Sequence, residues 1–296
     1  RKLPDDMVAI SAEAENDMCS ITCGMSQFQI LGMPAEDFPD LPTMDSIHSF
    51  SIPEREIKSI IAQTLFAVSS DETRPVHLGS LFEMDETGLT VVSVDGFRMA
   101  LRRTPVKDQK EMEKFSFVVP GASLAEVEKI ASERENPAII TEGARHVQFQ
   151  MGDTVLISRR LEGEFLNYRQ AIVRNNSIVL YANPKDLLSS IERVSLIISE
   201  KLKSPLRCIF GENVLSIRTT TALGKASDEC AVEGDGKQLE IGFNNRYLMD
   251  ALKAVPAQRV RLELGTSISP CLILPEEEGD ESFLYMVLPV RLKAGV

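Results

Sequence analysis

The sequence predicts an α+β protein made of repeated modules, each with two helices packed on antiparallel sheets. The first observation is a strand–proline–helix segment that occurs twice, at Pro53 and at Pro184, which are separated by 131 positions. The second is the run of short segments between the helices in which apolar and polar residues alternate, as in half-buried strands. The third is the size: 296 residues, 43% of them hydrophobic, can fill more than one core.

The first 49 residues are expected to contain strands and no helix. Three strand-like pieces follow one another: Val8 to Ala12, Met18 to Ile21 and Gln27 to Leu31. The segment around Phe38 then matches the segment around Phe165, 127 positions later. We therefore interpret this region as the tail of an earlier copy of the module, whose front is absent from the chain.

The first helix of each complete module is expected to start at a proline, with Pro53 and Pro184 in the first helical position. An apolar stripe at helical spacing follows each proline. The stripe residues are Ile57, Ile60, Ile61, Thr64 and Leu65 in one module, and Leu187, Leu188, Ile191, Val194 and Ile198 in the other. Both helices are therefore expected to pack one face on a sheet.

The second helix of each module repeats at a similar distance, because Leu124 and Leu248 are separated by 124 positions. In the earlier copy Ser123 and Glu126 have the spacing of a capping box, which predicts that the helix begins at Ser123. The later copy is expected to run through Tyr247 and the residues after it.

Strands are expected between and after the helices of both modules. In the earlier one they are Ser80 to Glu83, Leu89 to Val94, Met99 to Arg103, His146 to Met151 and Thr154 to Arg159. In the later one they are Arg207 to Phe210, Val214 to Thr219, Lys225 to Val232, Val260 to Leu264, Cys271 to Leu274 and Phe283 to Leu292. Arg259 and Arg261 are interpreted as ordinary strand-surface charges.

Composition and missing motifs argue against several classes of protein. The net charge of −12 disfavours binding of nucleic acid by bulk electrostatics, although it allows a local basic strip. No phosphate-binding glycine loop or serine-nucleophile motif occurs, and no apolar run approaches the roughly 18 residues of a membrane span. The five cysteines are expected to be free thiols in a reducing cytosol, with Cys19 and Cys23 on one face of a strand. We expect no catalytic residues, no metal site and no cofactor.

Five motifs occur in order along the chain: Phe38 to Pro42, Arg74 to Gly79, Asp95 to Ala100, Leu161 to Gln170 and Leu288 to Leu292. Together they resemble the motifs of the bacterial sliding clamp, the beta subunit of DNA polymerase III, over essentially the whole chain. The resemblance implies the C-terminal part of module one at 1–49, a central module at 50–176 and a C-terminal module at 177–296. It also implies that the first ~75 residues of module one are absent, which would affect ring closure.

The resemblance implies a cytoplasmic, non-enzymatic homodimer that closes head to tail around duplex DNA and binds it without regard to sequence. Such a ring holds the catalytic subunit of DNA polymerase III on its template, and also binds the clamp loader and other proteins that carry a clamp-binding motif. The residues expected at the dimer interface are Gln27, Phe28, Ile30, Leu196 and Ile197.

In this family the helices line the hole of the ring, and the sheets form the rim. The cations expected to face DNA are Arg55, Lys58, Arg74, Lys129, Lys185, Arg193, Arg246 and Lys253. Acidic residues such as Glu54, Glu126 and Asp250 lie among them, so the strip is only partly basic. Weak, dispersed phosphate contacts suit a protein that must slide along DNA.

The family binds short hydrophobic peptides in a pocket between its second and third modules. The matching positions are His77, Val94, Gly96, Phe97, Arg98, Met99, Leu166, Gln170, Ala171, Met286, Leu288, Pro289, Val290, Arg291 and Leu292. Apolar residues at the end of the chain suit the anchoring of such a peptide. Leu166 and Val173 stand where the family commonly has proline, which predicts a changed wall of the pocket.

Two other classes of function are alternatives to the clamp. A scaffold of tandem α+β modules with no DNA role would share the fold and would explain the acidic charge directly. A hydrolase using acids such as Asp95 and Glu162 would need a metal ion or a pocket of groups with shifted pKa, and no feature of the sequence indicates either.

Overall fold

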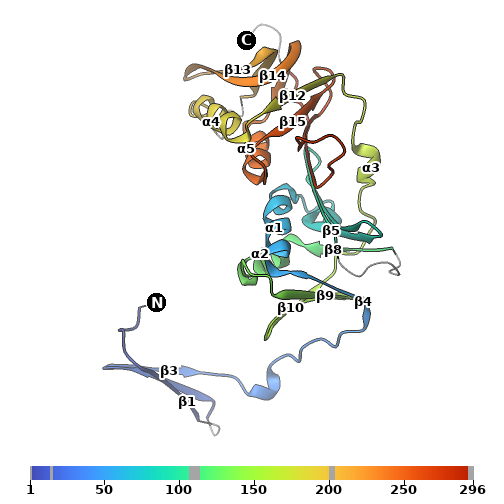
Figure 1. Cartoon of the computed structure of the whole chain (residues 1–296). Coiled ribbons are helices and arrows are strands. Elements are labelled where there is room, and N and C mark those ends of the chain that lie inside the picture. Colours follow the sequence, from blue (N-terminus) through green and yellow to red (C-terminus); the bar gives the residue numbers. More distant parts are fainter. Residues whose placement is uncertain (1, 14–15, 107–113, 200–203, 293–296) are drawn as a thin grey trace. The chain divides into compact units, whose positions relative to one another are not determined.

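The computed structural model describes residues 2–13, 16–106, 114–199 and 204–292 (Figure 1). The chain divides into two compact units, residues 1–43 and 44–296. Helices in both halves of the second unit pack on antiparallel sheets, which confirms the predicted α+β class.

The first unit contains a three-stranded antiparallel sheet, as the sequence predicts. Its strands, in order, are β1 (Val8–Glu13), β2 (Met18–Cys23) and β3 (Ser26–Leu31). A short 3-10 helix, η1 (Ala35–Asp37), is an exception to the expectation that this region lacks helical residues. Cys19 and Cys23 both lie on β2, four positions apart and therefore on one face, and both are free thiols.

The second unit is built on two sheets. Its elements up to the middle are β4 (Ser46–Pro53), α1 (Glu54–Thr64), η2 (Leu65–Ala67), η3 (Pro75–Leu78), β5 (Gly79–Asp85), β6 (Gly88–Val94), β7 (Arg98–Thr104), β8 (Phe115–Pro120), α2 (Gly121–Ile130), β9 (Pro137–Gly143), β10 (His146–Met151) and β11 (Thr154–Arg159). They continue with α3 (Tyr168–Ala171), β12 (Ile178–Ala182), α4 (Pro184–Ser195), β13 (Leu206–Thr221), β14 (Gly224–Phe243), α5 (Asn245–Ala254), β15 (Val260–Leu264), β16 (Cys271–Pro275) and β17 (Phe283–Val287).

Within the described residues, the larger sheet runs through both halves of the second unit. Its strand order is β13-β14-β12-β15-β16-β17-β7-β6-β5-β8, and the smaller sheet has the order β11-β10-β9-β4. β17 pairs antiparallel with β7, with Met286 opposite Met99 and Leu284 opposite Leu101. A strand from the end of the chain is thereby hydrogen-bonded to a strand of the central module, and the two modules share one sheet.

The predicted helix starts are right at one proline and wrong at two other places. Pro184 is the first residue of α4, behind the side-chain cap of Asn183. Pro53 is instead the N-cap of α1 and the last residue of β4. The capping box is wrong, because α2 begins at Gly121 and the Ser123 hydroxyl lies 2.7 Å from the hydroxyl of Ser158.

Each module has its own core between helices and sheet. The apolar stripe of α1 is buried together with four phenylalanines from strands, and the stripe of α4 packs in a second cluster with β13 and β15. Ile57, Ile60 and Ile61 have no exposed surface, as the period of the sequence predicts. The expected strands at 207–210 and 214–219 join into the single strand β13, with two register shifts on its pairing with β14.

Candidate functional site

The helices α1, α2, α4 and α5 lie on one side of the sheets (Figure 1). α1 contacts both α2 and α5, and α4 packs against α5, so the helix faces of the two modules are neighbours. This surface, which we call the helix surface, carries most of the cations that the sequence suggested for DNA contact. Arg74 is the exception, because it is the exposed N-cap residue of the 3-10 helix η3.

Cations of the central module are held by carboxylates. Arg55 Nη1 lies 2.5 Å from Glu135 Oε1, and Lys58 Nζ lies 3.0 Å from Glu133 Oε1. On α2, Lys129 Nζ lies 2.7 Å from Glu126 Oε1. The side chains of these pairs are mostly exposed, and exposed ion pairs typically contribute less than about 1 kcal/mol because water competes for both charges. Another anion can therefore replace the carboxylate in such a pair at little cost in free energy.

The same pattern holds in the C-terminal module. Arg193 Nε lies 2.6 Å from Asp228 Oδ2, and Lys253 Nζ lies 3.2 Å from Glu192 Oε1. The hydrogen bond from Arg193 is the main reason that the pKa of Asp228 falls below its ordinary value. Lys185 and Arg246 are exposed in the first turns of α4 and α5. The helix surface is therefore a mixture of both charges.

Several of the residues suggested for a peptide pocket lie where β7 pairs with β17. Met99 and Met286 face each other across these strands, and both are almost completely buried, as is Val94. His77, on η3, has its ring 5.5 Å from that of Phe165. Burial of its imidazole, with Arg74 near, lowers the pKa of His77. The buried methionines form a floor rather than an open surface.

Exposed apolar side chains surround that floor. Phe97 is 59% exposed, and its ring stacks on Tyr247 of α5 at 6.0 Å. The backbone of the final segment is fixed by two hydrogen bonds, from Leu288 N to Phe97 O and from Val290 N to Gly242 O. Val290 is 39% exposed. Residues 288–290 therefore connect the loop before β7 to the C-terminal module.

Arg98 connects the start of β7 to helix α5. Its Nε donates to Asp95 at 2.8 Å, and its Nη1 donates to Asp250 of α5 at 2.6 Å. The guanidinium carbon lies 4.6 Å from the ring centre of Tyr247 and 5.3 Å from that of Phe66. Burial raises the pKa of the Tyr247 hydroxyl. One side chain thus ties the central module to the C-terminal one, which fixes the position of neighbouring Phe97.

The segment between β11 and β12, residues 160–177, carries the suggested residues Leu166, Gln170 and Ala171, and we call it the linker. Asn167 caps α3 by accepting the N–H of Gln170. Tyr168 donates to Glu83 at 3.1 Å, and Arg169 donates to the same carboxylate at 2.6 and 3.0 Å. Burial, with Glu83 nearby, raises the pKa of Tyr168. The linker is anchored on β5, while Leu166, Gln170 and Ala171 on it are exposed or half-buried.

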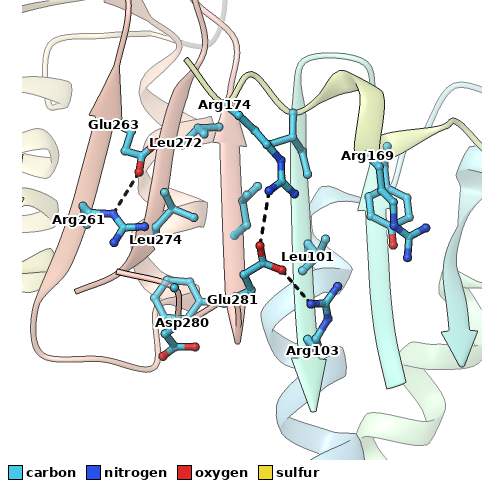
Figure 2. Close-up of a pocket in the computed structure, with 15 residues that line it drawn as sticks. Leu101, Arg103, Arg169, Arg174, Arg261, Glu263, Leu272, Leu274, Asp280 and Glu281 are labelled. Carbon is cyan, nitrogen blue, oxygen red and sulfur yellow. Dashed lines mark hydrogen bonds and ion pairs between the residues drawn. The ribbon is translucent and has the colours of Figure 1, made fainter. Parts of the chain in front are cut away.

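A second cleft lies on the face of the large sheet away from the helices, and the linker forms part of its wall (Figure 2). It has a volume of about 220 Å³ and is lined from β7, β15, β16, β17, the linker and the loop after β16. None of the residues that the sequence suggested as site residues lines it. Sequence reasoning missed it because its cover comes from segments far apart in the chain.

The residues suggested for a dimer interface fall in both units. Gln27, Phe28 and Ile30 lie on β3, where Phe28 is 49% and Ile30 is 53% exposed. Leu196 and Ile197 follow the end of α4, and Leu196 is 84% exposed. Phe28, Ile30 and Leu196 are thus apolar side chains on open surfaces, as an interface requires.

Comparisons with known proteins identify the family. Residues 51–167 match the family model for the central domain of the DNA polymerase III beta subunit, and residues 169–291 match the model for its C-terminal domain. The beta sliding clamp of Staphylococcus aureus is 32% identical over 293 residues, which are 98% of this chain and 76% of that protein. The chain belongs to the bacterial sliding clamp family.

Other clamps agree with this assignment. The beta sliding clamp of Halalkalibacterium halodurans is 31% identical over 295 residues, which are 98% of this chain and 77% of that protein. The crystal structure of the DNA polymerase sliding clamp from Bacillus subtilis superposes with a TM-score of 0.89 at 28% identity, and covers 99% of this chain and 77% of the other. The clamp fold is therefore shared over nearly the whole length of this chain.

Membership of the clamp family does not favour the scaffold with no DNA role. In the part of the chain that the structure describes, no group of three or more His, Cys, Asp or Glu side chains could hold a metal ion. No helix in the described ranges is long and apolar enough to cross a membrane.

Proposed function

We propose that this protein is a sliding clamp that encircles duplex DNA, holds the replicative DNA polymerase on its template and catalyses no reaction itself. The observation that carries the proposal is the clamp fold itself, shared with the Bacillus subtilis clamp over 99% of the chain, with the four long helices of both modules on one side of the sheets. The division into modules at 1–49, 50–176 and 177–296 belongs to this proposal.

DNA would face the helix surface. Several of its exposed cations are held by one carboxylate that a phosphate can replace, as Lys129 is by Glu126 and Lys253 by Glu192. Because the carboxylates return when the phosphate moves on, contacts of this kind are weak and independent of sequence. Enclosure rather than affinity would then retain the protein on DNA, which is compatible with a net charge of −12.

Partner proteins would bind at the rim between the modules. A hydrophobic peptide could cover exposed Phe97, Val290 and Leu166 above the methionine floor, since an apolar anchor with a fixed surround is the usual form of a peptide-binding site. The family relation makes the polymerase III catalytic subunit and the clamp loader the expected partners. A cytoplasmic homodimer joined through β3 and the end of α4 completes the proposal.

The DNA contact is tested by changing Lys129 and Lys253 to Glu together in the full-length protein. We expect primer extension by the polymerase to become several-fold less processive, because two positive charges on the helix surface become negative. The matched control changes exposed Lys114 and Lys225, which lie outside the helices, to Glu, with the same change in net charge. Equal processivity of both double variants and the wild type would contradict the assignment of the helix surface.

A further inference from the structure

The cleft beside the linker, which we call the arginine cleft, has no part in the proposed function. It lies in the central and C-terminal modules only, on the face of the large sheet opposite the helices (Figure 2). Arg261 and Glu263 enter it from β15, and Leu272 and Leu274 from β16. On β15 these two charged residues alternate with Val260, Leu262 and Leu264, which lie in the core of the C-terminal module.

Arg261 is not the surface charge that its place on a strand predicted. Its side chain is only 10% exposed, whereas that of Arg259, just before the same strand, is 42% exposed. Leu274 is its partner across the strands, and other lining residues come from the linker and from the loop at 279–281. Alternation along β15 predicts that Arg261 faces solvent, but the linker and the loop at 279–281 cover this face of the strand.

The guanidinium of Arg261 lacks hydrogen-bond acceptors. Its Nε lies 3.1 Å from Glu263 Oε1, which is close enough for an ion pair but does not satisfy the N–H. Nε and Nη1 are both buried with no hydrogen-bond partner in the described residues. An N–H group buried without an acceptor costs free energy, so such a group in a native protein calls for a missing partner.

The other lining arginines have acceptors. Arg103 donates to Glu281 at 2.8 Å, and Arg174 lies 3.7 Å from the second oxygen of the same carboxylate. Arg169 is held by Glu83. Figure 2 shows Arg103 and Arg174 converging on Glu281 on one side of the cleft and Arg261 with Glu263 on the other. Unused donors are therefore concentrated at Arg261.

Apart from Tyr168, Gly279, Asp280 and the arginines and glutamates named above, the lining of the cleft is apolar. Leu101, Leu272 and Leu274 are 2 to 7% exposed, and Ile172 of the linker also lines the space. A volume of about 220 Å³ accommodates a few carbon atoms with a polar head, and is smaller than the roughly 300 Å³ at which sites for drug-sized molecules begin. The cleft therefore suits a short aliphatic group.

We propose that the arginine cleft binds a carboxylate carried on a short aliphatic stem. A carboxylate would supply an acceptor that the buried N–H groups of Arg261 lack, and the stem would rest on Leu272 and Leu274. The carboxylate could belong to a free short-chain acid or to the C-terminal residue of a peptide, since the head and stem are alike in both.

The test is a titration of the full chain with pentanoate, followed by ligand-observed NMR. Saturable binding of pentanoate, and none of pentanol at the same concentrations, is expected because only the acid supplies acceptors for Arg261. The acetylated tripeptide Gly-Val-Leu, with a free carboxylate or with an amide at its end, distinguishes the two sources. Binding of either acid supports the proposal. Failure of both acids to bind, or equal binding of acid and its neutral analogue, overturns it.

Variants locate the binding in the cleft. Arg261→Gln is expected to weaken binding of the acid at least tenfold, while Arg259→Gln, a matched change at an exposed position just before the same strand, leaves it within twofold. Leu274→Phe fills the apolar part and should also weaken binding, which keeps the test available if Arg261→Gln does not fold. Unchanged binding in a folded Arg261→Gln or Leu274→Phe protein overturns the proposal. Neither DNA nor a polymerase is needed, so this result is independent of the clamp function.

Discussion

The helix surface and the joint between the modules use the same residue types in opposite ways. On the helix surface several cations lie in the open beside a single carboxylate, as Arg55 lies beside Glu135 with both side chains more than half exposed. At the joint, Arg98 is 12% exposed in its side chain and is held by two carboxylates and two aromatic rings. The first arrangement leaves charges available for exchange, and the second fixes them in place.

This difference distinguishes charges suited to brief contacts with DNA from charges that hold the two modules together. Replacing the carboxylate of an exposed ion pair by a phosphate changes the free energy little, so the helix surface can contact one phosphate after another. Removing one partner of a buried pair leaves the other charges unpaired, which costs several kcal/mol. Arg98 is therefore expected to maintain the relative position of the modules and the shape of the peptide rim, rather than to act mainly through its charge.

The largest effect is expected for Arg98→Ala. The change leaves Asp95 and Asp250 without their partner and removes the packing on Tyr247, so we expect a loss of about 3 kcal/mol in the free energy of unfolding. Urea denaturation followed by circular dichroism measures it. Arg55→Ala on the helix surface is the matched control, expected to lower the urea midpoint far less. Equal shifts in the two variants would remove the distinction between the two regions.

An intermediate effect is expected at the residues proposed to bind a partner peptide. Leu288→Ala removes an apolar side chain beside Phe97, which should weaken a fluorescent clamp-motif peptide about tenfold, as loss of one anchoring contact typically does. Fluorescence anisotropy gives the dissociation constant. Val155→Ala, an exposed position on β11 away from the joint, serves as the control. A peptide that binds the wild type and Leu288→Ala equally would place the partner site elsewhere.

The smallest effect is expected at Glu54, which is intermediate between the two kinds of charge. It is buried at the start of α1 but pairs with a backbone N–H, because its carboxylate accepts from Ser132 N at 2.9 Å. The hydrogen bonds from the Ser132 side chain and backbone lower the pKa of Glu54 below its ordinary 4.5. Its stabilisation is present above that ordinary value and is lost as the pH falls through the lowered one.

Glu54→Gln should therefore show a smaller fall in thermal stability between neutral and acid pH than the wild type. Thermal unfolding at a series of pH values from about 6 downward measures this difference. The control is Glu126→Gln on the exposed face of α2. An identical pH dependence in Glu54→Gln and the wild type would show that this carboxylate does not contribute in the way its contacts indicate.

Local sequence patterns predicted the elements well, because their period depends on neighbours along the chain. The stripe of Ile57, Ile60 and Ile61 and the strands around it lie where the periods place them. Strand β9 was missed, since Pro137 opens it and no clear alternation marks it. The start of α2 was misplaced because a proline N-cap at Pro120 takes precedence over the capping-box pattern at Ser123.

The contacts of the candidate sites were far less predictable than their residues. That Met99 lies opposite Met286, and Arg98 beside Asp250, follows from pairing across more than 150 positions, which no local pattern records. Arg261 shows the opposite failure, because its local pattern assigned it to solvent while distant segments cover it. The cleft around it could be found only in three dimensions.

The central claim is that enclosure retains the protein on DNA, and topology tests it most directly. The full-length protein is loaded by the clamp loader onto a nicked circular plasmid and onto the same plasmid after linearisation, and both are washed at high salt. The account predicts retention on the circle and rapid loss from the free ends of the linear form. Equal retention on the two DNAs, or equal loss from both, would contradict it.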